Sequence, residues 1–386
     1  MRYPATMGRA AARLAGWAVG LVVVMQSIAG SAAPWNLTFE GGAEEDTNVQ
    51  RVETGPGLDT HQIESGVVRI GGKLDRRARI AGGTYAAIMS ALARMVSSKD
   101  ASSENVMLFA GELRYLRPVE DRRVSFGVAL AGVDAVPITN EVGARTFANL
   151  GADALLVLDG NDDRHLTVGL GWRDFTYKEK DDFSWSGPAA SARLDLELWA
   201  PSGGTRSLEL AAFAAFEARE YNSTALVDAC PPGATPSDSC SAGTSRTRRD
   251  RSQRIGVEAT YTGRVIATLG YQLTVIDSNS FGQSLIRHRA TTSVTRSLPW
   301  SMFGTALAIL QFDQFVDGLV VKKDLQRSEF TSLDDENRSS LQLRLGRPVT
   351  GAWTVEARGA IWRDLGGSMD TSFRRASVYF GAIYAR

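Results

Sequence analysis

Apolar and polar residues alternate with a period of two along most of this 386-residue chain. Residues 339–365 show the pattern. Leu341, Leu343 and Leu345 alternate with polar residues, a short Pro- and Gly-containing turn follows, and the alternation resumes from Trp353 to Ile361. Successive side chains of a β-strand point to opposite sides, so each arm has one apolar face and one face rich in Arg, Gln and Glu. The stretch predicts a β-hairpin whose apolar face must be covered by protein or by lipid.

The same segment recurs about sixteen times, and the connections between segments alternate in length. Short turns such as "DRR" and "PSGG" are followed by long polar stretches such as "VSSKDASSE" and "EKDDFSWSG". These features predict an all-β fold, a transmembrane antiparallel β-barrel with short periplasmic turns and long extracellular loops. Closing the ring pairs every strand edge without water. The strands are expected at 35–50, 61–74, 78–92, 105–117, 122–134, 145–158, 164–177, 189–200, 205–221, 252–263, 265–278, 284–297, 300–315, 337–347, 351–363 and 372–385.

A secreted soluble β-sandwich or β-helix is the alternative fold. A β-helix should show a short fixed repeat, and the sequence has none. Six tryptophans near the expected strand ends suit an aromatic girdle at the membrane interfaces. They are Trp35, Trp172, Trp199, Trp300, Trp353 and Trp362.

The N-terminus resembles a secretory signal peptide. Arg2, Arg9 and Arg13 precede a moderately long apolar run that ends in small residues, and this order predicts a signal peptide at 1–32 and a barrel at 33–386. An uncleaved membrane anchor is the alternative. Removing the segment takes away three Arg and no acid, which leaves a slightly acidic chain. That balance excludes a nucleic-acid binder. A secreted chain that forms a transmembrane β-barrel is expected in the bacterial outer membrane.

The polar face of the strands would line the barrel interior, where charged rings select what passes a pore. Arg287 and Arg289 are the strongest functional candidates, because two inward arginines on one strand exceed the acid expected nearby. Cross-strand ion pairs that only stiffen the wall are the alternative for any one residue. The candidate pore-lining residues are Arg173, Arg193, Arg254, Arg287, Arg289, Arg344, Arg358, Glu112, Glu197, Glu258 and Glu356, and Arg375, Asp195 and Glu209 share their parity.

The carboxyl end, "SVYFGAIYAR", resembles the assembly signal of bacterial outer-membrane β-barrels at Gly381 and Tyr384, although it ends in Arg386 and not in an aromatic residue. Two further stretches resemble barrels that accompany exopolysaccharide export. They are "GGAEEDTNVQR", with Gly42, Asp46 and Asn48, and "DSNSFGQSLIRHR" at 277–289. The alternative is that these Asp, Asn and Ser residues simply form loops at the extracellular rim.

Family membership would imply a passive exit pore for a sugar polymer. Its partners would be outer-membrane lipid, the barrel assembly machinery, a periplasmic polysaccharide-export protein and the polymer itself. A general diffusion porin for small polar solutes is the alternative function, and a surface enzyme built on a barrel is a weaker one.

Catalytic and metal-binding patterns are weak. The sequence has three histidines, His61, His165 and His288, and the outward parity that His288 shares with Ile286 suits neither a catalytic dyad nor a zinc site. The stretch "DGNDD" at 159–163 lacks the glycine and the distal glutamate of a calcium loop. We therefore expect no enzyme activity, cofactor or metal.

The two cysteines, Cys230 and Cys240, lie in one expected surface loop, where an oxidising compartment favours a disulfide. Two free thiols or an intermolecular bridge are the alternatives. The basic run that follows, "TSRTRRDRSQR", is expected to be a solvated part of the same loop.

Overall fold

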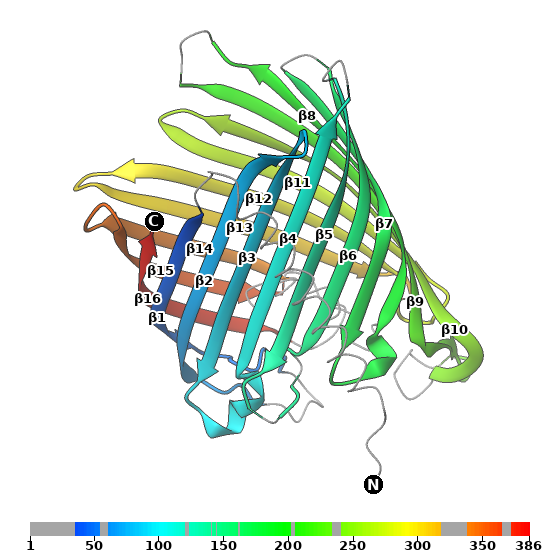
Figure 1. Ribbon diagram of the computed structural model, residues 1–386. Coiled ribbons are helices and arrows are strands. Elements are labelled where there is room, and N and C mark those ends of the chain that lie inside the picture. The colour runs from blue at the N-terminus through cyan, green and yellow to red at the C-terminus, as the bar shows by residue number, and fades with distance from the viewer. Residues whose placement is uncertain are drawn as a thin grey trace.

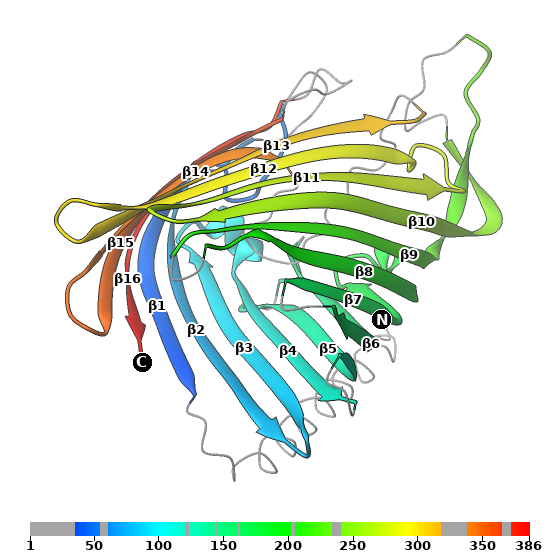
Figure 2. The ribbon, with the colours of Figure 1, turned by 90° about the horizontal axis from the view of Figure 1, so that it is seen from above.

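The computed structural model describes residues 35–54, 61–119, 123–139, 141–143, 145–160, 163–201, 205–233, 241–317, 338–364 and 372–386. In these ranges sixteen strands form one closed antiparallel barrel, in which each strand pairs with its neighbours in sequence and β16 pairs with β1 (Figures 1 and 2). The predicted fold class is confirmed. The strands are β1 (Asn36–Asp46), β2 (Ser65–Ile80), β3 (Gly83–Val96), β4 (Val106–Pro118), β5 (Val124–Pro137), β6 (Phe147–Asp159), β7 (Arg164–Tyr177), β8 (Trp185–Trp199), β9 (Ser207–Asp228), β10 (Ser241–Thr262), β11 (Val265–Ser278), β12 (Leu285–Leu298), β13 (Met302–Phe315), β14 (Ser339–Pro348), β15 (Trp353–Arg363) and β16 (Arg374–Ala385).

The connections alternate in length as predicted. The β2–β3 turn consists of Ala81 and Gly82, both at positive φ (49° and 77°), which suits a two-residue hairpin turn. The opposite rim carries the longer connections, including two short 3₁₀ helices, η1 (Lys99–Glu104) and η2 (Asp181–Phe183). The short-turn rim is the periplasmic one in barrels of this type, and the long-loop rim is extracellular.

The predicted apolar face lies on the outside of the barrel. Leu343 is 55% exposed and Leu269 is 63% exposed, and the same outward parity holds for many other large apolar side chains on the sheet. In a soluble protein this surface would be an aggregation hazard, whereas in lipid it is the band that a spanning barrel requires. Within the described ranges, no helix has the length and apolar character needed to cross a membrane.

The seam between β1 and β16 is closed by backbone bonds and by one aromatic ring. Leu37 and Arg386 exchange two backbone hydrogen bonds of 2.8 Å. The Tyr379 ring lies over Gly42 and Gly381, which are opposite each other in register. A Cβ at Gly42 would come within 2.5 Å of the ring and 2.4 Å of the Phe380 carbonyl oxygen. The ring can lie flat against the wall because both positions lack side chains.

Two local expectations are wrong. The strands β9 and β10 are each 22 residues long, so the basic run at 244–254 belongs to a strand that extends beyond its neighbours (Figure 2) and not to a loop. Trp362 is 7% exposed and packs inside the barrel, with the Arg375 guanidinium 4.2 Å from its ring centroid. It therefore cannot belong to an interfacial girdle, whereas Trp172, Trp199, Trp300 and Trp353 are exposed.

Three predictions fall on residues outside the described ranges. These are the signal peptide at 1–32, Cys240 with the predicted Cys230–Cys240 disulfide, and the middle of the 159–163 stretch.

Candidate functional site

Most of the predicted interior charges take part in ion pairs along the wall. On β14 and β15, the Glu356 carboxylate accepts from both Arg344, at 2.6 Å, and Arg358. Arg358 also reaches Glu40 of β1 at 2.9 Å, and its guanidinium lies 4.7 Å from the Tyr379 ring centroid. These residues link four strands, β14, β15, β16 and β1, at the β1–β16 seam. On this side of the barrel the charged residues therefore form cross-strand ion pairs, as the alternative to a pore-lining role describes.

Two further predicted arginines form two-point bonds with aspartates that the sequence analysis did not single out. Arg173 donates to both oxygens of Asp153 at 2.9 and 3.0 Å. Arg287 donates to both oxygens of Asp313 at 2.8 and 2.9 Å. Of the two arginines expected to exceed the local acid, Arg287 has a partner, because Asp313 lies directly opposite it in the β12–β13 register. Register depends on the partner strand, which parity along one strand cannot reveal.

A cavity of about 570 Å³ opens inside the wall formed by β6–β12, and we call it the basic cavity. Arg289 lines it and has no ion-pair partner among the described residues. Arg254 lies 3.8 Å from Glu217, whose carboxylate already accepts from Arg219 at 2.7 and 3.0 Å. The lining includes Arg173, Trp185, Glu217, Arg219, Arg254, Gln272, Arg287 and Arg289.

A second cavity, of about 210 Å³, lies next to the basic cavity and shares Glu258 with it. We call it the acidic cavity, because Asp195, Glu197 and Glu209 line it. Its one lining arginine, Arg193, contacts Asp195 at 2.8 Å and Glu258 at 3.9 Å. The interior of this wall therefore changes sign along its height, with acid on the side of the short turns.

The last predicted candidate, Glu112, belongs to neither cavity. It lies exposed on β4, opposite Ile88 of β3 and Ala131 of β5.

An aromatic row follows the extracellular half of the interior, and the sequence analysis missed it. The rings of Phe147, Phe175, Trp185 and Tyr221 follow one another at centroid distances of 5.8, 6.0 and 6.5 Å. Arg219 lies 4.7 Å from the Trp185 ring and Arg248 lies 3.9 Å from the Tyr221 ring. The sequence signal for this row was an aromatic residue at an inward-facing position on each of four consecutive strands. These contacts stiffen the wall above the basic cavity.

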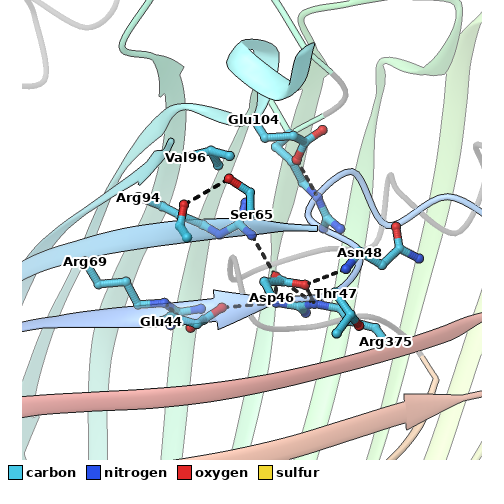
Figure 3. A network of polar contacts seen from close by, with 12 residues as sticks. Glu44, Asp46, Thr47, Asn48, Ser65, Arg69, Arg94, Val96, Glu104 and Arg375 are labelled. Carbon is cyan, nitrogen blue, oxygen red and sulfur yellow. Dashed lines mark hydrogen bonds and ion pairs between the residues drawn. The ribbon is translucent and has the colours of Figure 1, made fainter. Parts of the chain in front are cut away.

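The motif "EEDTN" at the end of β1 builds a buried network at the extracellular mouth (Figure 3). Asp46 accepts from Arg375 of β16 at 2.7 Å and from Arg94 of β3 at 2.9 Å. Glu44 pairs with Arg69 of β2 at 2.7 Å. All five side chains are at least nine-tenths buried. The network ties together the first three strands and the last one.

Asn48, the last residue of this motif, forms hydrogen bonds with backbone groups. Its amide donates to the carbonyl oxygens of Val52 and Arg374 at 2.9 and 3.1 Å and accepts from the Val52 N–H at 3.1 Å. In the second stretch, 277–289, Asn279 also bonds backbone groups. Asn279 bonds the backbone of Thr247 and Arg249 at 3.0 and 2.8 Å. Asn48 therefore holds loop backbone, which is what the loop-forming alternative describes, whereas Asn279 holds the outer part of β10.

At the same rim Arg338 joins two loop segments. It donates to Glu53 at 2.8 Å and to Asp364. Burial lowers the pKa of the Arg338 guanidinium, and the two carboxylates outweigh this effect and hold the pKa above its ordinary value. The charge is therefore permanent, and the contact holds at any physiological pH.

No group of three or more potential metal ligands comes together in the described parts of the chain. His165 bonds Asp159 at 2.7 Å at an exposed turn. His288 bonds the Tyr271 hydroxyl at 2.7 Å, on the outward side of the wall.

No family model matches the chain, and no curated protein sequence matches it. Similar solved structures exist. Pseudomonas putida OprB is 9% identical, with 92% of this chain and 94% of that chain covered and a TM-score of 0.50. Acinetobacter baumannii OccAB1 is 9% identical over 92% and 96% of the two chains, at a TM-score of 0.46. A bacterial polysaccharide outer membrane secretin is 9% identical over 91% and 98%, at a TM-score of 0.41. The likeness to OprB is one of fold.

Proposed function

We propose that this chain, which is a bacterial outer-membrane β-barrel, is a passive channel through which an exopolysaccharide leaves the cell. The observation that carries the proposal is the interior of the β6–β12 wall. There a cavity of about 570 Å³ presents guanidinium, amide and hydroxyl groups on an otherwise ion-paired surface. Sugar hydroxyls both donate and accept hydrogen bonds, so a lining of fixed polar groups can exchange partners with a passing chain.

The transport step would need no energy source in this protein. The sequence has no glycine-rich phosphate loop that follows a strand and opens a helix. Polymer synthesis or a periplasmic partner would therefore supply the driving force. The short-turn rim offers little surface for docking, because its β2–β3 turn, for example, has two residues. A separate periplasmic polysaccharide-export protein would complete the route, and the barrel assembly machinery would insert the chain into outer-membrane lipid.

Deletion of the gene tests the proposal against the diffusion porin. We expect the deletion strain to lose cell-surface polysaccharide while its uptake of small polar nutrients stays unchanged. Complementation with the wild-type chain should restore the polymer. Normal surface polymer together with slowed solute uptake would assign the chain to the diffusion porins and overturn the proposal.

A further inference from the structure

Resting on the proposed function, we infer that the basic cavity binds an anionic substituent of the exported saccharide, such as a sugar carboxylate, with Arg289 as the cation that receives it. The strand β12 supplies two inward arginines to this cavity. Arg287 is 4% exposed and already holds both oxygens of Asp313. Arg289 lies two residues further along the same face, opposite Gln272 and Gln311. Neither neighbour can neutralise it.

The carboxylates that line the cavity are committed elsewhere. Glu217 accepts two bonds from Arg219 and still lies 3.8 Å from Arg254, so one negative charge serves two guanidinium groups. Glu258 lies at the border with the acidic cavity, 3.9 Å from Arg193. Among the described residues, the local balance leaves Arg254 and Arg289 without full compensation. A ligand carboxylate would supply the missing negative charge.

A neutral hydrogen-bond donor at the cavity is also unsatisfied within the described ranges. Trp185 is 6% exposed and lines the cavity, and its indole N–H has no hydrogen-bond acceptor in the part of the chain that the structure describes. Gln272 uses its amide N–H group on Thr274 at 3.1 Å. A buried donor without an acceptor costs free energy, which a ligand oxygen can recover. A carboxylate accepts several such bonds at once, and charge-assisted bonds are about twice as strong as neutral ones.

The adjoining acidic cavity makes a small free anion a poor ligand. Asp195, Glu197 and Glu209 stand on the side of the short turns, so a lone anion from that side meets like charge first. A saccharide chain brings its carboxylate together with neutral hydroxyl groups that can bond to the acidic residues. We therefore assign the cavity to acidic saccharides and not to small anions in general.

Titration calorimetry on the intact barrel in detergent tests the inference, because it reports binding whether or not ions flow. The probes are trigalacturonate, the neutral trimer maltotriose, and acetate as the small carboxylate. We expect trigalacturonate to bind at least about tenfold more tightly than maltotriose, a difference that one charge-assisted contact can supply. We expect the difference to shrink as salt is raised. Arg289→Gln should abolish it, and Arg289→Lys should keep part of it.

Arg296→Gln is the matched control, since Arg296 lies on β12 with outward parity and is exposed. It should leave trigalacturonate binding unchanged. Heat-modifiable migration on gels shows that each variant has folded. Equal binding of the two trimers, an unaffected Arg289→Gln variant, or acetate binding as tight as that of trigalacturonate would each overturn the inference. None of these results decides whether the deletion strain loses polymer, so the proposed function is judged separately.

Discussion

At the residue scale, Asp46 lies at the centre of the buried network at the extracellular mouth. Its carboxylate is fully buried and neutralises Arg375 and Arg94, which come from the last strand and the third strand. Asp46→Asn keeps the shape and removes the charge, leaving two buried guanidinium groups undercompensated. Loss of one partner of a buried ion pair costs about 3–5 kcal/mol. We expect a correspondingly lower unfolding temperature of the barrel, measured by heat-modifiable gel migration or by urea titration in detergent.

Glu45→Gln supplies the control for that measurement. Glu45 is the adjacent residue on β1 and is exposed on the opposite face. This variant removes the same charge from the same strand and should unfold like the wild type. An Asp46→Asn barrel that is as stable as the control would show that the network contributes nothing to closure.

At the element scale, the β1–β16 seam depends on the flat contact between Tyr379 and two glycines. Gly42→Ala places a methyl group 2.5 Å from the ring, so the ring or the strand must move. Overpacking of this kind costs about 1–3 kcal/mol. Gly41→Ala is the matched control, since a Cβ at Gly41 meets nothing within 4 Å. We expect the first variant alone to yield less folded barrel in the membrane fraction, and equal yields would refute the role of the contact.

The β9–β10 hairpin gives the second prediction at this scale. We expect non-reducing mass spectrometry to find one link between Cys230 and Cys240, and thiol reagents to label neither residue on intact cells. The closed loop is short, so reduction should hardly change the unfolding temperature. Ready labelling of both cysteines would contradict the disulfide.

At the scale of the whole molecule, the position of the membrane follows from which face is apolar. Leu343 and Gln342 are neighbours in the middle of β14, with Leu343 outward and Gln342 inward. An arginine on the lipid face near the bilayer midplane costs about 2–4 kcal/mol, whereas lumen substitutions are tolerated. Leu343→Arg should therefore lower the unfolding temperature in detergent-free liposomes, and Gln342→Arg should not. Equal effects of the two variants would contradict the assigned lipid face.

The contrast between an apolar and a polar face also determined which strands could be predicted from the sequence. Strands such as β14 were predictable because one face is apolar and the other polar. The outer part of β10 was not, because Arg248 and Asp250 on one face and Arg249 and Arg251 on the other give no contrast in polarity. The interior position of charges followed from parity. Their partners did not, since Asp313 reaches Arg287 through a register that only the paired strands define.

Because β1 and β16 close the sheet, the same ring of strand pairs could form from a chain that begins at a different strand. Leu37 and Arg386 already exchange backbone hydrogen bonds, so a short linker could join these two residues. The chain could then be opened at the two-residue β2–β3 turn. Such a circular permutant would keep every strand pair and the whole Asp46 network while beginning at β3 and ending at β2. Such a permutant would separate two properties that the natural strand order combines. The stability of the ring should not depend on which strand comes first. Delivery to the membrane should depend on which strand comes last.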